Sequence, residues 1–156
     1  MDNTIDLVDV ALRLGAAVMV GIVIGFDREW RGKPLGIRTM ALVCLGSALV
    51  CVATMHLEAL DHDPQALSRV IQGIVTGVLT GVGFLGAGAV LQRGGSGQIE
   101  GLTTAATVWV AAALGVACGL ASWEVVGVGA ALTLCVLIAL YPLDLLVARL
   151  RRDKRD

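Results

Sequence analysis

Charged residues are scarce in this sequence, and they are concentrated in a few short segments. Only 16% of the 156 residues are charged, against about 25% in soluble domains. Four stretches of 19 to 23 residues contain no Asp, Glu, Lys or Arg: 39–57, 70–92, 102–123 and 125–143. A soluble bundle of buried helices needs a polar outer surface, and so few charges cannot supply one. The scarcity of charge therefore argues against an ordinary soluble domain.

Residue patterns typical of enzymes and metal sites are also missing. No Walker A sequence, zinc-ligand spacing or Ser-His-Asp set occurs, and the G-x-G-x-x-G match at 81–86 lies in an apolar run with no room for a sheet. The four cysteines lie in apolar runs without a C-x-x-C pair, so we interpret them as small structural residues. We expect no catalytic residue, metal ion, cofactor or nucleic-acid partner.

The apolar stretches are long enough to cross a membrane. Hydrophobic residues make up 56% of the chain, the mean hydropathy is +0.82, and a membrane crossing needs about 20 apolar residues. A further stretch near the N-terminus contains Asp9 and Arg13, which are four residues apart and can pair on one helix face. The sequence thus predicts an all-α integral membrane protein, a bundle of five transmembrane helices. The expected spans are about 5–26, 38–57, 70–92, 102–123 and 125–147.

Basic residues fall almost entirely on one side of such a bundle. With five spans, ten of the twelve Lys and Arg residues lie in the 27–38 connection, the 93–101 connection or the C-terminal tail. Cytoplasmic segments carry an excess of Lys and Arg, so this asymmetry predicts that the N-terminus is outside and the C-terminus is cytoplasmic. We expect a transmembrane domain at 1–147 and a basic cytoplasmic tail at 148–156.

Glycines recur along the third predicted span. In lipid, a stripe of small residues on one helix face lets two backbones approach closely. The 21–25 and 115–119 segments carry similar G-x-x-x-G stripes. Two interpretations stay open for the third span, namely tight packing within one bundle or an interface in a homodimer or larger homo-oligomer. The glycines expected to pack there are Gly73, Gly77, Gly81, Gly83, Gly86 and Gly88.

Polar residues gather in two connections that the expected topology places on the cytoplasmic side. Acidic and basic side chains are interleaved there, which favours a salt-bridged network over a bare cation site. Such a network can order loops or recognise an anionic headgroup or a partner chain, and an ion or substrate gate is a third interpretation. We expect Arg38, which opens the second span, to pair with a carboxylate. The expected cluster is Asp27, Arg28, Glu29, Arg31, Arg38, Thr39, Glu100, Thr103 and Thr104.

Four motifs occur in order along the chain. They are GFDRE at Gly25–Glu29, GIRT at Gly36–Thr39, GFLGAG at Gly83–Gly88 and GLTTAA at Gly101–Ala106. Together they resemble the MgtC/SapB family of bacterial inner-membrane proteins, over about residues 10–140. The resemblance implies an all-helical domain in the inner membrane that is not an enzyme. It also implies a link to adaptation to scarce magnesium and to survival inside host cells.

The expected function is regulatory, through contacts with other membrane proteins. The expected partners are the lipid bilayer, a membrane protein and a second copy of the chain. The alternative is a transporter or channel component for a divalent cation. A permeation path should place ionisable residues near the bilayer midplane, and the four later spans have none there. This favours the regulatory function and leaves the alternative open.

Overall fold

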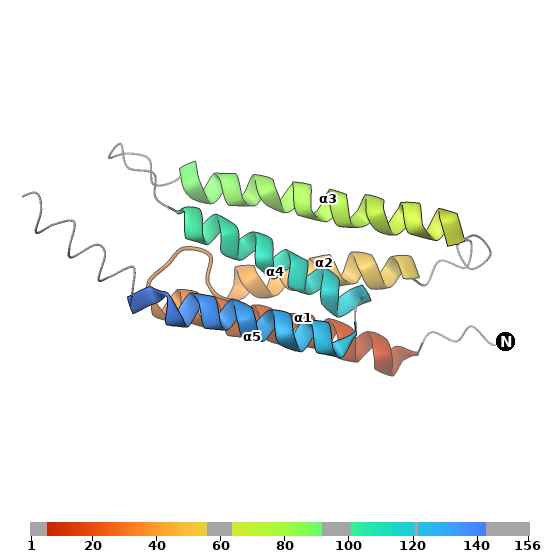
Figure 1. Ribbon diagram of the computed structural model, residues 1–156, viewed down its shortest axis with the longest axis horizontal. Coiled ribbons are helices and arrows are strands. Elements are labelled where there is room, and N and C mark those ends of the chain that lie inside the picture. Colours follow the sequence, from red (N-terminus) through yellow and green to blue (C-terminus); the bar gives the residue numbers. More distant parts are fainter. Residues whose placement is uncertain (1–5, 56–63, 92–100, 121, 143–156) are drawn as a thin grey trace, which may run out of the picture.

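The structure, a computed structural model of the chain, describes residues 6–55, 64–91, 101–120 and 122–142. These residues form five α-helices and no strand (Figure 1). Four of the helices are long and apolar enough to cross a membrane, and the fifth, with 17 residues, is shorter. The all-helical class predicted from the sequence is confirmed for the described residues. The helices are α1 (Leu7–Trp30), α2 (Ile37–Met55), α3 (Pro64–Leu91), α4 (Leu102–Leu120) and α5 (Trp123–Ala139).

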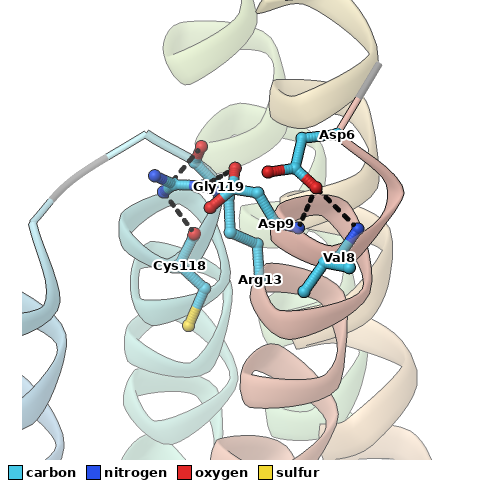
Figure 2. A network of polar contacts seen from close by, with 6 residues as sticks. All are labelled: Asp6, Val8, Asp9, Arg13, Cys118 and Gly119. Carbon is cyan, nitrogen blue, oxygen red and sulfur yellow. Dashed lines mark hydrogen bonds and ion pairs between the residues drawn. The ribbon is translucent and has the colours of Figure 1, made fainter. Parts of the chain in front are cut away.

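Local chemistry sets the two ends of α1. At its start, the Asp6 carboxylate accepts hydrogen bonds from the backbone N–H groups of Val8 (3.0 Å) and Asp9 (3.4 Å), which have no partner within the helix (Figure 2). At its end, Gly32 has a φ of +61°, the left-handed conformation that commonly terminates helices. The helix therefore continues to Trp30, one turn beyond the predicted end of the first span. The segment expected to begin a connection lies instead on the last turn of α1.

Successive helices run in alternating directions, so α1, α3 and α5 point one way and α2 and α4 the other (Figure 1). The central helix is α4, which packs against each of the other four, and α2 packs mainly against α1 and α4. The main neighbour of α3 is α4, whereas α5 makes smaller contacts with α4 and α1. The buried core comes mostly from α1, α2 and α4. It consists of Ala17, Ile24, Met40, Cys44, Ala48, Val108, Ala111, Leu114, Cys118 and Val126.

Two glycine pairs bring α1 and α4 into close contact with α2. A Cβ atom on Gly21 or Gly25 would lie 2.5 Å from a backbone Cα atom of α2. Further along α2, a Cβ atom on Gly115 would meet the carbonyl oxygen of Cys44, and one on Gly119 would lie 2.7 Å from the Cβ atom of Cys51. Only glycine leaves room for backbones at these distances. Both G-x-x-x-G stripes are thus packing surfaces for α2.

The glycines of α3 behave differently. Among the described residues, no atom lies within 4 Å of a Cβ atom built on Gly73, Gly77, Gly81, Gly83 or Gly88. Gly86 alone among the six meets a neighbour, because its Cβ atom would lie 3.3 Å from the Cβ atom of Ala105 in α4. Tight packing within one bundle, the first interpretation of the stripe, therefore does not hold for the other five. An interface with another chain stays a prediction.

The cysteines are all free thiols. Cys44, Cys51 and Cys118 are buried between α2 and α4, as expected of small structural residues, and the Cys44 thiol donates a hydrogen bond to the Ala111 carbonyl (3.1 Å). Cys135 on α5 is exposed on the outer surface of the bundle instead. Its apolar surroundings in the sequence therefore indicate a helix face open to lipid rather than a core position.

Candidate functional site

Three consecutive charged residues, Asp27, Arg28 and Glu29, occupy the last turn of α1. Successive residues of an α-helix point about 100° apart, so these three side chains leave α1 in different directions. Each one makes contacts with a different part of the bundle, and together they define the candidate site.

Arg28 joins α1 to α4. The residue is 3% exposed, and its guanidinium donates hydrogen bonds to the hydroxyl of Thr104 and to the carbonyl oxygen of Pro34 (3.4 Å). Thr104 is also buried and lies in the first turn of α4. The N-terminus of a helix carries partial positive charge, so a buried cation there needs oxygen acceptors around it. Arg28 therefore connects α1, the loop after it and the beginning of α4.

The start of α4 is itself held close to the end of α3. Gly101, the residue before α4, has a φ of +92°, which residues other than glycine rarely adopt. A Cβ atom at this position would lie 2.8 Å from the carbonyl oxygen of Ala89 in α3. The glycine of the GLTTAA motif thus permits the turn that brings Thr104 to Arg28.

Asp27 acts through Arg31, four residues later. The Asp27 carboxylate accepts a hydrogen bond from the Arg31 Nε atom at 2.8 Å, and both side chains are less than a fifth exposed. The Arg31 guanidinium lies over the ring of Tyr141, 3.9 Å from its centroid. A cation over an aromatic face is attracted to the negative charge of the ring. This pair therefore ties the end of α1 to the residues that follow α5.

Glu29 contacts the beginning of α2. Its carboxylate accepts a hydrogen bond from the backbone N–H of Ile37, the first residue of α2, at 3.1 Å. A Cβ atom on Gly36 would lie 2.7 Å from the same carboxylate oxygen. The glycine of the GIRT motif therefore leaves room for Glu29, and the negative charge sits favourably at a helix N-terminus.

Other residues of the predicted cluster lie apart from these contacts. Arg38 and Thr103 are exposed, Thr39 is half-buried, and Glu100 lies outside the described residues. Arg38 makes no ion pair with a described residue, so its predicted pairing with a carboxylate stays a prediction. Within the described part of the chain, no three His, Cys, Asp or Glu side chains come together in a way that could hold a metal ion.

Sequence reasoning did not identify Tyr141 as part of the site. Tyr and Trp are enriched where helices leave the hydrocarbon layer, and Tyr141 stands near the expected end of the last span. The aromatic side chain at that depth was the signal in the sequence that could have identified Tyr141 as a site residue. Which cation it meets depends on how α1 and α5 lie in the bundle, and the sequence does not specify this.

A second polar cluster lies at the opposite end of α1 (Figure 2). The predicted pair of Asp9 and Arg13 is confirmed, with a distance of 2.8 Å between the Arg13 Nε atom and a carboxylate oxygen. Arg13 also donates hydrogen bonds to the carbonyl oxygens of Cys118 (3.2 Å) and Gly119 (3.5 Å). These carbonyls belong to the last turn of α4, where carbonyl oxygens accept no hydrogen bond from their own helix. Arg13 therefore caps α4 from α1.

The fold and the polar clusters define a multi-pass membrane protein whose charged side chains are concentrated near helix ends. Residues 14–145 match the MgtC family. The match spans most of the sequence, and the chain belongs to the MgtC family. Its multi-pass architecture and its relatives place it in the bacterial inner membrane.

Several characterised proteins are similar to this chain. Protein SrpB of Synechococcus elongatus is 41% identical over 140 residues, which cover 85% of this chain and 75% of that protein. Protein MgtC of Salmonella typhimurium is 37% identical over 129 residues, covering 83% of this chain and 51% of that protein. YhiD of Escherichia coli, named as a candidate magnesium transporter, is 41% identical over 130 residues, covering 81% of this chain and 58% of that protein.

The chain thus spans only about half of the length of MgtC and YhiD. No solved structure matches it.

Proposed function

We propose that this protein is a regulatory protein of the inner membrane that acts through contacts with other membrane proteins and is not an enzyme. We further propose that it serves adaptation to scarce magnesium and survival inside host cells. Membership of the MgtC family supports this proposal. The runner-up is a component of a magnesium transporter, which the name of YhiD favours.

One observation favours regulation over transport. In the described residues, every Asp, Glu, Lys and Arg of the five helices lies within two turns of a helix end. The hydroxyl groups of Ser47, Thr107 and Thr133, which lie farther from the helix ends, each donate a hydrogen bond of 2.7 to 2.8 Å to a carbonyl oxygen four residues earlier in their own helix. A path for a divalent cation would be expected to place ionisable oxygen ligands along the middle of the helices.

The open face of α3 supports the contact with another membrane protein. Gly77 and Gly81 line a groove between α2 and α3, together with apolar side chains and the small residues Gly46 and Ser47. A transmembrane helix from another protein can approach the positions of Gly77 and Gly81 closely, because glycine has no side chain.

The function test compares two substitutions of open glycines. Gly77→Leu is expected to abolish support of growth in low magnesium, because it fills the α3 face. Gly127→Leu is the matched control: Gly127 on α5 also has nothing within 4 Å of its Cβ position, and growth should be retained. Both variants should reach the membrane in similar amounts, since neither glycine is packed within the chain.

Transport is tested separately with the purified protein in liposomes. We expect no more magnesium uptake than in protein-free liposomes, measured with an enclosed magnesium-sensitive dye. Uptake that depends on the protein would overturn the regulatory function in favour of the runner-up. Equal growth of the Gly77→Leu and Gly127→Leu strains would remove the α3 face from the proposal.

We also propose that all five helices cross the membrane, with residues 1–147 as the membrane domain, the N-terminus outside, and residues 148–156 as a cytoplasmic tail. The alternating helix directions and the concentration of basic residues on one side support this topology. In a cysteine-free protein, Asn3→Cys should react with a membrane-impermeant thiol reagent in intact spheroplasts, and Arg155→Cys should react only after lysis. The opposite labelling would reverse the topology.

A further inference from the structure

The helix α5 is packed less tightly than the rest of the core. Val126 is its only buried residue among those described. Between α1 and α5 lies a cavity of about 210 Å³ that is partly open to the outside and is lined only by apolar side chains. The apolar surfaces of these two helices therefore do not close fully on each other. The lining residues are Met19, Val20, Val23 and Ile24 of α1 and Ala130 and Leu134 of α5.

Both ends of α5 are held by arginines of α1. Arg13 lies over the ring of Trp123, the first residue of α5, at 5.6 Å from the ring centroid. Arg31 lies over the ring of Tyr141, just beyond the last residue of α5, at 3.9 Å. Each guanidinium is fixed by an aspartate four residues earlier on α1, with an Nε–oxygen distance of 2.8 Å in both cases. The same arrangement thus occurs twice.

The spacing of the two contacts is matched. Arg13 and Arg31 are 18 residues apart, and so are Trp123 and Tyr141. Eighteen residues correspond to about five helical turns, so both arginines lie on the same face of α1, roughly 27 Å apart along its axis. This separation is close to the thickness of the hydrocarbon layer, about 30 Å. Because α1 and α5 run in the same direction (Figure 1), the two contacts form in one register of the helices.

We infer that these two arginine–aromatic contacts hold α5 onto α1 and fix its register, and that α5 separates from the bundle as a unit when both are lost. The packing of α1, α2 and α4 rests mostly on glycine contacts and buried side chains of these three helices, and among the described residues α5 adds only Val126 to that core. Along its length α5 also contacts α4, where a Cβ atom on Gly129 would lie 3.0 Å from a side-chain atom of Leu114. Its attachment to α1 is made at the two ends, where each guanidinium is partly shielded from water and its attraction to an aromatic face is correspondingly stronger. This inference does not rest on the proposed regulatory function.

The test measures how fast α5 can be bridged to α1 in native membranes. Val20→Cys and Ala130→Cys, which line opposite sides of the cavity, are combined in a cysteine-free protein and treated with a short bifunctional thiol reagent. One version carries Trp123→Leu and Tyr141→Leu, which remove both rings. The matched version carries Trp123→Phe and Tyr141→Phe, which keep an aromatic face at both positions. We expect the leucine version to be bridged about fivefold more slowly or worse, and the phenylalanine version to stay within about twofold of the parent.

A second cysteine pair reports on the rest of the bundle. Gly86→Cys and Ala105→Cys place their Cβ atoms 3.3 Å apart between α3 and α4, close to the separation in a disulfide. Oxidation of this pair should proceed at the same rate in the leucine and phenylalanine versions. Equal bridging of α1 to α5 in the two versions would overturn the inference. A parallel loss of the α3–α4 disulfide in the leucine version would also overturn it, since α5 would then not separate as a unit.

Discussion

Arg28→Met is expected to lower the free energy of unfolding in detergent by about 3 kcal/mol, because it leaves two oxygen acceptors without their donor at a buried site. The acceptors are the Thr104 hydroxyl and the Pro34 carbonyl. Methionine keeps much of the side-chain volume, so the loss reports on the hydrogen bonds more than on packing. The free energy of unfolding of Arg28→Lys should lie between those of the parent protein and Arg28→Met, since one ammonium group cannot reproduce the geometry of a guanidinium.

Arg38→Met is the matched control for Arg28. Arg38 belongs to the same basic segment but is exposed, and exposed substitutions usually change stability by no more than about 0.5 kcal/mol. The double variant Arg28→Met, Thr104→Ala should lose less stability than the sum of the two single variants, because they share one interaction. Equal losses for Arg28→Met and Arg38→Met would contradict the placement of Arg28 at the centre of the site.

Gly115→Ala is expected to destabilise the bundle by about 2–3 kcal/mol, because a single added methyl group would overlap a backbone atom of the neighbouring helix. The Cβ atom would meet the carbonyl oxygen of Cys44 in α2, and a backbone carbonyl cannot rotate away as a flexible side chain can. The helices α2 and α4 would have to move apart along their whole contact. Thermal unfolding in detergent measures the loss.

Gly77→Ala provides the comparison for Gly115→Ala. Both changes replace a helical glycine by alanine, which on its own favours the helix by about 1 kcal/mol. No described atom lies within 4 Å of the Cβ position of Gly77, so stability should be unchanged or slightly higher. If Gly77→Ala proved as harmful as Gly115→Ala, the stripe on α3 would have to be covered by another chain in the purified protein.

Much of the fold follows from the sequence because lipid restricts the choices. The charge-free runs predict the helices in the right order, and the i, i+4 spacing of Asp9 and Arg13 predicts their pair. The four motifs predict the family, which residues 14–145 confirm. Hydrophobic length and local spacing are properties of the chain itself, so they can be identified without knowing the neighbours of a helix.

The choice of packing glycines could not be predicted in the same way. The 21–25, 73–81 and 115–119 segments share the same spacing, yet only the first and third meet a neighbouring backbone. Spacing identifies a face that can be approached closely. Whether another helix occupies that face depends on how all five helices are arranged, and lipid can cover a glycine stripe as well as a helix can.

The arrangement of the site was also only partly predictable. The sequence indicates that Asp27, Arg28 and Glu29 are at the end of a span, but not that α1 continues through them. On a helix the three side chains diverge, which is why Arg28 reaches α4 and Glu29 reaches α2, whereas Asp27 pairs with Arg31 at the end of α1. The central role of Arg28 rather than Arg38 follows from this extra turn, since it turns Arg28 inward to the start of α4.

The packing of α2 against both α1 and α4 has a consequence for biosynthesis. One neighbour of α2 is made before it, but the other emerges from the ribosome only after α3. At about 5–20 residues per second, several seconds separate the synthesis of α2 from that of α4. During this interval the face of α2 that later receives Gly115 and Gly119 meets lipid or the insertion machinery. We therefore expect α1 and α2 to pair before α4 is available, and α3 to gain its main neighbour only once α4 has been made.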